Sequence, residues 1–349
     1  MLIHGGNYNE GVVDFSVNTN PCVTEAYMAE LMAKHSDKAL KYPEIDGESL
    51  LKAISETWEI EPSRLMIGNG AIDCLYQLTA ALKSETAVIV EPTFSEYRKA
   101  LEMTGTAVAS LPYDMKLSPS DAEAQLLNQL TKIRANLVVI CNPNNPTGHC
   151  YSDDFVQKLI LAQERHKGYV LIDESFRFFE NIPSYYNKKS WNCLILTSLT
   201  KYYGIPGLRI GYLAGNYSLI ESIKKAQMPW NINGVALAVT KELMIDEGLK
   251  NRTSDWYKRE KDFMVEGLSR LKGINIMTSQ ANYLLCQLEH VKGSELNQWL
   301  LEASEPMALR ECHSFPGLSD NYIRIGLKDH KANEGLINKL QEYWRLNHE

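Results

Sequence analysis

The segment CLILTSLTKYYGIPGLR, residues 193–209, decides the expected fold because an apolar run leads directly into a cluster of hydroxyl and basic side chains. Ser198 lies three positions before Lys201, and Arg209 lies eight positions after it. Hydroxyls and an arginine fork can hold a phosphate beside a lysine amine. A lone lysine after a strand is usually a solvated surface charge, so the neighbours carry the argument. The segment indicates a ligand with both a phosphate and an amine-reactive aldehyde.

Two further apolar runs end in polar residues suited to the same site. Asp173 ends the run 169–173, and Asn145 follows the run 137–140 in a turn rich in proline and asparagine. Ligand-facing residues of open α/β sheets gather at such strand ends. A carboxylate there keeps a pyridinium nitrogen protonated and makes the ring an electron sink, while the Asn145 amide can point at a ring substituent. Together the three segments predict pyridoxal 5′-phosphate (PLP) as the cofactor, bonded to Lys201 as the catalytic residue.

The ordered set of motifs resembles that of fold-type I PLP-dependent enzymes, the aspartate aminotransferase superfamily. The motifs are Asn-Pro-Asn-Asn-Pro-Thr-Gly at 142–148, Asp173-Glu174, and Ser198-x-x-Lys201 with Arg209, and the resemblance covers nearly the whole chain. Each motif alone also fits an ordinary turn, a strand end or a surface lysine. The ordered set is highly specific, and it implies PLP fold type I.

Alternating strand and helix patterns predict an α/β fold with a mostly parallel seven-stranded sheet and helices on both faces. The expected strands are 64–67, 86–90, 107–111, 137–140, 169–172, 193–196 and 210–214. We assign residues 41–235 to a large PLP-binding domain and residues 236–349 to a smaller α+β domain. The resemblance implies that residues 1–40 join the small domain.

The small domain is expected to combine helices with a few strands. Residues 236–271 read as helical, with interruptions at 246–248 and at 251–254, where a second helix could be capped. The other expected helices are 293–301 and 332–346, and the expected strands are 274–277, 283–288, 307–310 and 322–327.

Composition limits the classes of function. The 349 residues are 44% hydrophobic, which suggests about two domains with substantial cores. A net charge of −7, with acidic and basic residues interspersed, argues against nucleic-acid partners and a membrane-surface role. No segment approaches the ~20 apolar residues of a membrane span, and residues 1–6 lack a secretory pattern, so we expect a cytoplasmic protein. The seven cysteines are scattered and the histidines lack metal-ligand spacing, which predicts reduced thiols and no metal.

Further cofactor contacts are expected around these motifs. Gly70, Ala71 and Ile72 follow a strand and open a helix, whose N-terminal backbone N–H groups suit the cofactor phosphate; a plain glycine turn is the alternative. Ser198, Thr200 and Arg209 would share that phosphate. The resemblance implies an aromatic stacked on the pyridine ring, for which Phe94 is the first choice and Tyr97 the second, although either also fits a core position. It also implies that Tyr42 reaches the phosphate from the neighbouring subunit of a homodimer, with a surface tyrosine as the alternative.

Residues outside these shared cofactor-binding motifs bear on which reaction the protein catalyses. Aminotransferases of the superfamily usually have a tyrosine three residues after the pyridine aspartate, where this chain has Phe176. This feature, the HGGN sequence at 4–7 and DFSVNTNP at 14–21 resemble the threonine-phosphate decarboxylase family of cobalamin biosynthesis, which is related to histidinol-phosphate aminotransferase. The resemblance implies that Arg324 binds the substrate carboxylate and that Arg310 and His4 bind its phosphate.

The expected function is decarboxylation of an O-phosphorylated amino acid, threonine phosphate first, to an amino-alcohol phosphate. Serine phosphate stays open as the substrate. The first alternative is an aminotransferase acting on histidinol phosphate or a similar amine. The second is a catalytically silent PLP-fold protein that binds or regulates, against which the presence of Lys201 and Asp173 argues.

Overall fold

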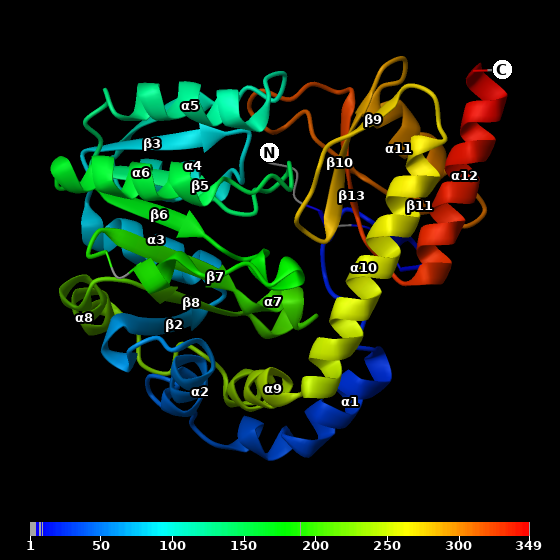
Figure 1. Ribbon diagram of the computed structural model, residues 1–349. Coiled ribbons are helices and arrows are strands. Elements are labelled where there is room, and N and C mark those ends of the chain that lie inside the picture. Colours follow the sequence, from blue (N-terminus) through cyan, green and yellow to red (C-terminus); the bar gives the residue numbers. More distant parts are fainter. Residues whose placement is uncertain (1–4, 7, 9, 189, 349) are drawn as a thin grey trace.

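The computed structural model describes residues 5, 6, 8, 10–188 and 190–348 and consists of two α/β parts joined along one side (Figure 1). The larger part is built on a seven-stranded sheet in the order β2-β8-β7-β6-β5-β3-β4. Only β8 runs against its neighbours, β2 and β7, while the other pairs are parallel. The strands are β2 (Leu65–Asn69), β3 (Thr86–Glu91), β4 (Ala107–Pro112), β5 (Leu137–Cys141), β6 (Tyr169–Asp173), β7 (Cys193–Ser198) and β8 (Ile210–Ala214). The predicted mostly parallel sheet is confirmed.

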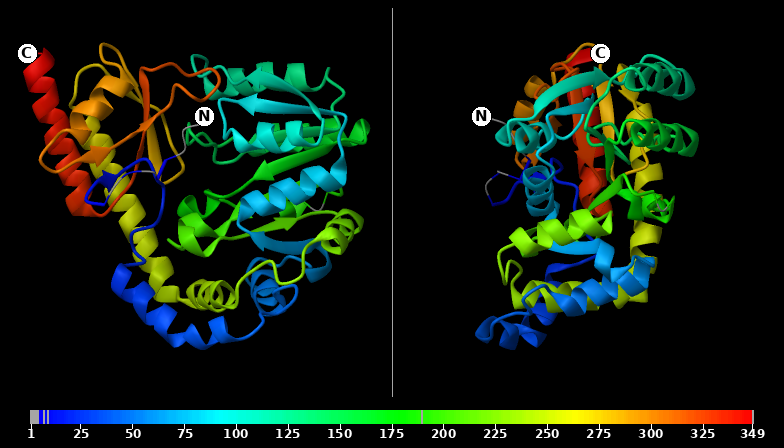
Figure 2. Two further views of the ribbon diagram at one scale, coloured as in Figure 1. Left: turned by 180° about the vertical axis from the view of Figure 1, so that it is seen from behind. Right: turned by 90° about the vertical axis from the view of Figure 1, so that its left-hand side faces the viewer.

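Helices cover both faces of this sheet, which explains why its strands are continuously apolar. Val88 and Val90 of β3 face the main core, whereas Ala87 and Ile89 face a second apolar cluster. The second cluster is completed by α3, α4 and α8, and the main core by α5 and α6, on the opposite side in Figure 2. The helices of this part are α2 (Glu48–Trp58), α3 (Ala71–Leu82), α4 (Glu96–Met103), α5 (Pro119–Leu130), α6 (Asp153–Arg165), α7 (Leu199–Tyr202), α8 (Tyr217–Ala226) and α9 (Gly234–Ile245).

The smaller part contains an antiparallel sheet in the order β12-β13-β10-β9, together with three helices. Its elements are β9 (Ile274–Ile276), β10 (Tyr283–Leu288), β12 (Arg310–Glu311), β13 (Tyr322–Gly326), α10 (Glu247–Ser269), α11 (Gly293–Leu301) and α12 (His330–His348). Near the N-terminus, β1 (Val13–Asp14) pairs in parallel with β11 (Met307–Ala308), and α1 (Glu25–Lys34) follows. Short 3-10 turns occur at Ser36–Leu40, Pro62–Arg64, Arg177–Glu180, Tyr185–Lys188 and Pro206–Leu208.

Two local predictions were wrong. The strand expected at 307–310 is two strands in different sheets, because β11 pairs with β1 while β12 pairs with β13. The interruption expected at 251–254 lies inside α10, where Thr253 is buried on the face that also carries Trp256 and Tyr257. The helix break at Asp246 is real: its side chain accepts from the Leu249 N–H at 2.9 Å and caps α10.

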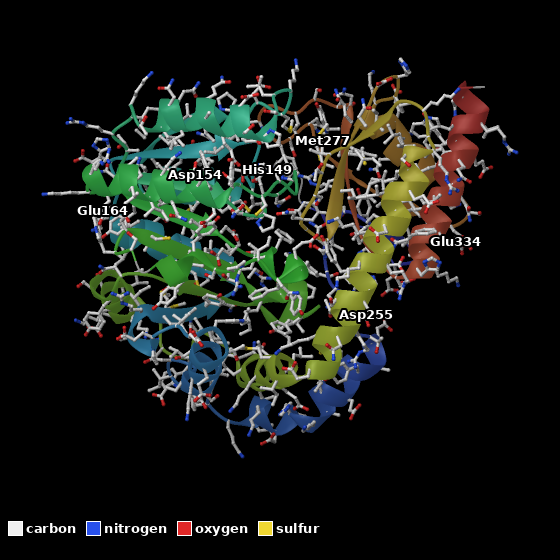
Figure 3. All side chains as sticks on the ribbon, viewed as in Figure 1. His149, Asp154, Glu164, Asp255, Met277 and Glu334 are labelled. Carbon is white, nitrogen blue, oxygen red and sulfur yellow. The ribbon has the colours of Figure 1, made fainter. Side chains whose placement is uncertain are left out.

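The two parts meet at a junction filled by side chains. His149 lies on the larger part and Met277 on the smaller one (Figure 3). A small apolar cluster of the smaller part, which includes Leu285 and Phe315, also contacts Met115 of the larger part. Among the described residues, no helix combines the length and the apolar character needed to cross a membrane.

Candidate active site

A cavity of about 290 Å³ lies at the carboxyl ends of β5, β6 and β7, next to the smaller part. Its wall contains eleven of the site residues predicted from the sequence: Ala71, Ile72, Phe94, Asn145, Asp173, Ser198, Thr200, Lys201, Arg209, Arg310 and Arg324. These residues come from eight different segments of both parts. The fold therefore gathers most of the sequence-predicted residues around one cavity.

Asp173 is a buried carboxylate at the end of β6 that receives two hydrogen bonds. The Tyr97 hydroxyl donates to its Oδ2 at 2.7 Å, and the Ser175 N–H donates to its Oδ1 at 2.9 Å. Burial raises the pKa of Asp173, while the hydrogen bonds and the Lys201 charge oppose that rise. These contacts fix the carboxyl group at the cavity wall, where it can pair with a protonated ring nitrogen.

Lys201 lies in α7, directly after β7, with its amine at the cavity. Burial first, and then the positive charges of Arg324 and Arg209, lower its pKa from 10.5 to about 8, against the opposing effect of Asp173. A lysine with this pKa is partly neutral near pH 8, which is the form that reacts with an aldehyde or accepts a proton.

The N-terminus of α3 and three side chains form an anion cradle. Gly70 precedes α3 without a side-chain cap, and Ala71 and Ile72 line the cavity. The Ser198 and Thr200 hydroxyls are 2.7 Å apart on the adjoining wall, beside Arg209. Backbone N–H groups at a helix N-terminus, together with hydroxyls and an arginine, are a strong combination for a phosphate.

Gly70 belongs to the cradle without lining the cavity, because it lies under the Arg209 side chain. A Cβ at this position would lie 2.5 Å from Arg209 Nη2, and the φ of Gly70 is +85°. Arg209 donates from Nη1 to the Pro206 carbonyl at 3.0 Å. The guanidinium is therefore held between its own turn and a glycine that leaves room for it.

Arg324 and Arg310 lie opposite each other on β13 and β12. Arg324 donates to the Asn145 side-chain oxygen and, from Nη2, to the Ser16 carbonyl at 2.6 Å. Arg310 donates from Nη2 to the Ser314 hydroxyl at 3.0 Å. Both are buried, and no carboxylate among the described residues forms an ion pair with either of them. Two buried guanidinium groups without a carboxylate provide a place for anions.

The remaining predictions concern Tyr42, His4 and the aromatic residue for stacking. Tyr42 is 84% exposed and packs against Trp230, with ring centroids 5.1 Å apart, outside the cavity of its own chain. His4 lies outside the described residues. Phe94 and Tyr97, the first and second choices for stacking, both line the cavity and meet edge-on at 5.7 Å, and Tyr97 directs its hydroxyl at Asp173.

Some residues of the wall were not selected from the sequence. Ser175, Ser16 and Ser314 all line the cavity. The Ser175 hydroxyl accepts from the Ser198 N–H at 2.9 Å and so links the ends of β6 and β7. A signal was present for two of them, because Ser175 follows Asp173-Glu174 and Ser16 lies in the motif at 14–21. Nothing in the sequence distinguishes Ser314 from other loop serines.

The donor set fits PLP. Lys201 offers an amine for the aldehyde, Asp173 a buried carboxylate for the ring nitrogen, and the cradle a site for the phosphate. The Asn145 oxygen is engaged by Arg324, which leaves the amide N–H₂ as the donor for a ring oxygen. Fold and site together define the class of fold-type I PLP-dependent enzymes.

Comparison with known proteins gives the family. The sequence profile described as aminotransferase class I and II matches residues 7–340, so the chain belongs to this family. It is 28% identical to the threonine-phosphate decarboxylase of Salmonella typhimurium over 97% of this chain and 95% of that protein. It is 26% identical to a histidinol-phosphate aminotransferase of Caldanaerobacter subterraneus over 86% of this chain and 84% of that protein.

A third relative is longer. The adenosylcobalamin biosynthesis bifunctional protein CobDQ of Leptospira interrogans is 29% identical over 96% of this chain, which spans 40% of that protein.

Solved structures agree with the fold. The histidinol-phosphate aminotransferase of Clostridium acetobutylicum superposes with a TM-score of 0.85 at 26% identity, covering 95% of this chain and 99% of that one. The enzyme of the same name from Sinorhizobium meliloti, solved in complex with pyridoxal-5′-phosphate, has a TM-score of 0.82 at 16% identity, covering 96% and 91%. The cofactor of this family, and of this chain, is PLP.

Proposed function

We propose that the protein is a PLP-dependent decarboxylase of an O-phosphorylated amino acid, with threonine phosphate as the first substrate and an amino-alcohol phosphate as the product. The observation that carries this proposal is the pair formed by Arg310 and Arg324, two buried arginines in register on neighbouring strands without a carboxylate partner among the described residues. A substrate with two anionic groups, a carboxylate and a phosphate, would satisfy both.

The contacts of the two arginines suggest which group each one binds. Arg324 is bonded to Asn145 and lowers the pKa of Lys201, so its charge is close to the reacting amine. We assign the α-carboxylate to Arg324. Arg310 is held by Ser314 and lies over the Phe315 ring at 5.2 Å, and we assign it to the phosphate, with His4 as a further proposed phosphate contact.

The chain's own groups then perform three tasks. When bound, PLP supplies an aldehyde for the substrate amine and a ring that accepts the electron pair of the broken bond. Arg324 fixes the direction of the carboxylate at Cα, and this orientation selects the bond that breaks. Asp173 keeps the ring nitrogen protonated. Lys201 Nζ, with a pKa of about 8, donates the proton that takes the place of CO₂ at Cα.

An aminotransferase acting on histidinol phosphate is the second candidate, and relatives with that name support it. Phe176 argues against it, because the superfamily's aminotransferases usually place a tyrosine there. Its ring packs edge-on against Tyr283 at 4.9 Å, and Phe176 has no hydroxyl to offer the cofactor. A silent binding protein is the third candidate, which the complete set of Lys201, Asp173 and phosphate cradle disfavours.

One experiment separates the three. The PLP-loaded protein is incubated with O-phosphothreonine, with and without 2-oxoglutarate, and CO₂ and glutamate are measured. We expect CO₂ without an acceptor. Glutamate formed only with the acceptor, tested also with histidinol phosphate, would establish the aminotransferase instead. No turnover of O-phosphothreonine, O-phosphoserine or histidinol phosphate would contradict both enzyme proposals.

We further propose a homodimer in which Tyr42 reaches the phosphate cradle of the partner. Large apolar side chains are exposed around Tyr42, at Leu40, Ile45, Met228 and Trp230. Trp230 packs against the Tyr42 ring, and the Trp230 backbone N–H donates to the Ile45 carbonyl at 3.2 Å. The segments around Tyr42 and Trp230 therefore form one surface. A contiguous exposed apolar surface of this kind is typical of a protein interface.

A further inference from the structure

The loop between β12 and β13, residues 312–321, carries two side chains into the active-site cavity. Ser314 and Phe315 line the cavity wall next to Arg310. The Ser314 hydroxyl accepts from Arg310 Nη2 at 3.0 Å, and the Arg310 guanidinium lies over the Phe315 ring at 5.2 Å. The loop therefore holds Arg310 from two sides.

The loop is anchored on both sides of Ser314. Cys312, Phe315 and Leu318 are buried in one apolar cluster with Leu285 of β10. The Phe315 N–H donates to the Cys312 carbonyl at 3.0 Å, and the Leu318 N–H donates to the Phe315 carbonyl at 3.0 Å. Ser314 sits between two anchored residues, so its hydroxyl is placed before a ligand arrives, which limits the entropy lost on binding.

The hydrogen bond to Arg310 determines what the Ser314 hydroxyl can still do. An arginine only donates, so the serine oxygen must accept, and its own proton is free to be donated. Among the described residues, no acceptor for this proton is found, and Ser314 lines the cavity. The cavity wall thus presents a hydroxyl donor directly beside the Arg310 guanidinium.

We propose that Ser314 is a specificity-determining residue that makes the Arg310 site select a phosphate monoester over a carboxylate. A phosphate monoester has three terminal oxygens, so two can take the guanidinium fork and the third can accept from Ser314. A carboxylate has two oxygens, and the fork uses both. A carboxylate has no third oxygen, so the serine proton must share an oxygen that already accepts from the fork, and a carboxylate gains less from the hydroxyl than a phosphate does. This inference rests on the proposed function, because it assigns the phosphate end of the same substrate.

The test compares O-phosphothreonine with L-glutamate, which carries a carboxylate at the corresponding end. Dissociation constants are measured from the change in cofactor absorbance of the PLP-loaded protein, so that no turnover is needed. The variants are Ser314→Ala, Ser314→Thr, which keeps the hydroxyl, and Ser319→Ala, the same change at an exposed serine of the same loop.

We expect Ser314→Ala to weaken O-phosphothreonine binding about tenfold, to weaken L-glutamate binding less, and to raise KM without a matching fall in kcat. Ser314→Thr should recover most of the affinity, and Ser319→Ala should behave as the wild type. Equal weakening of both ligands, or no weakening of either, would overturn the proposal. If O-phosphothreonine binds in a Ser314-dependent way but yields no CO₂, the decarboxylase assignment fails while the role of Ser314 stands.

Discussion

Tyr97 of α4 donates its hydroxyl to Asp173 at the end of β6, across 2.7 Å, inside the core of the larger part. Burial raises the pKa of Asp173, and the hydrogen bonds from Ser175 and from Tyr97 oppose that rise. We expect Tyr97→Phe to raise the pKa of Asp173 further, to weaken its pairing with the cofactor ring, and to lower PLP affinity about tenfold. PLP titration followed by absorbance measures this.

The control for this prediction is Tyr76→Phe. Tyr76 also donates to a carboxylate, Oε2 of Glu96 at 3.0 Å, and it does not line the cavity. Its removal should leave PLP affinity unchanged. An equal loss of affinity in the two variants would mean that the effect comes from the packing of α3 and α4 and not from Asp173.

Gly70 makes the phosphate cradle testable. Its substitution by alanine would place a Cβ 2.5 Å from Arg209 Nη2 at a positive φ of +85°, so the guanidinium must move away from the anion site. We expect Gly70→Ala to lower the affinity for PLP and for free phosphate at least tenfold. Isothermal titration calorimetry with the cofactor-free protein measures both.

Gly105 is the matched glycine, because its φ is +79° and a Cβ there meets nothing within 4 Å. Gly105→Ala should cost about 1 kcal/mol of unfolding free energy and leave PLP affinity unchanged. If both alanine variants lose affinity, backbone strain and not displacement of Arg209 is responsible.

The sequence was sufficient to predict the strand ends but not every side-chain partner. Lys201, Asp173 and Asn145 follow apolar runs, and parallel strands bring such ends to one edge of the sheet. The hydrogen bond from Tyr97 to Asp173 depends on how α4 packs against the sheet, which sequence spacing does not determine. The pairing of Arg310 with Arg324 depends on register, and the apolar run at 307–309 hid the change of sheet at Leu309.

Lys201 should lower the stability of the cofactor-free protein. A pKa of about 8 instead of 10.5 means that its charged form is disfavoured in the folded state, which costs about 3 kcal/mol below pH 8. We expect Lys201→Met to raise the unfolding free energy by that amount at pH 7. The gain should shrink between pH 8 and 10.5, because the folded-state lysine is already neutral there while the unfolded-state lysine loses its proton across that range.

Urea unfolding at several pH values measures this gain. Lys52→Met is the control, because Lys52 is an exposed lysine of α2, and the variant should show no pH-dependent gain. A gain at Lys201 that stays constant up to pH 10.5 would assign it to apolar packing and not to the charge.

Arg324 should set the pKa of Lys201 as well as bind the substrate. After burial, its charge has the largest effect in lowering that pKa. Arg324→Gln removes the charge, so we expect the Lys201 pKa to rise above about 8, whereas Arg324→Lys keeps a charge and should change it less. The pH dependence of Lys201 acetylation in the cofactor-free protein, followed by mass spectrometry, gives both values. Equal pKa values in the wild type and Arg324→Gln would contradict this electrostatic coupling.

Tyr42 provides a test of the dimer, because its ring is exposed and lies outside its own cavity. If Tyr42 serves the partner's cradle, chains carrying Tyr42→Ala and chains carrying Lys201→Ala should complement each other. In a mixed dimer, the Lys201 of the first chain then meets the intact Tyr42 of the second, and one site is wild type. Random mixing in equal amounts should give about a quarter of all sites with wild-type PLP affinity and absorbance.

If Tyr42 acts within its own chain, or not at all on the cofactor, mixing produces no site better than those of the two parents. Tyr217→Ala, at another exposed tyrosine, should bind PLP as the wild type does and so isolates the effect of position 42.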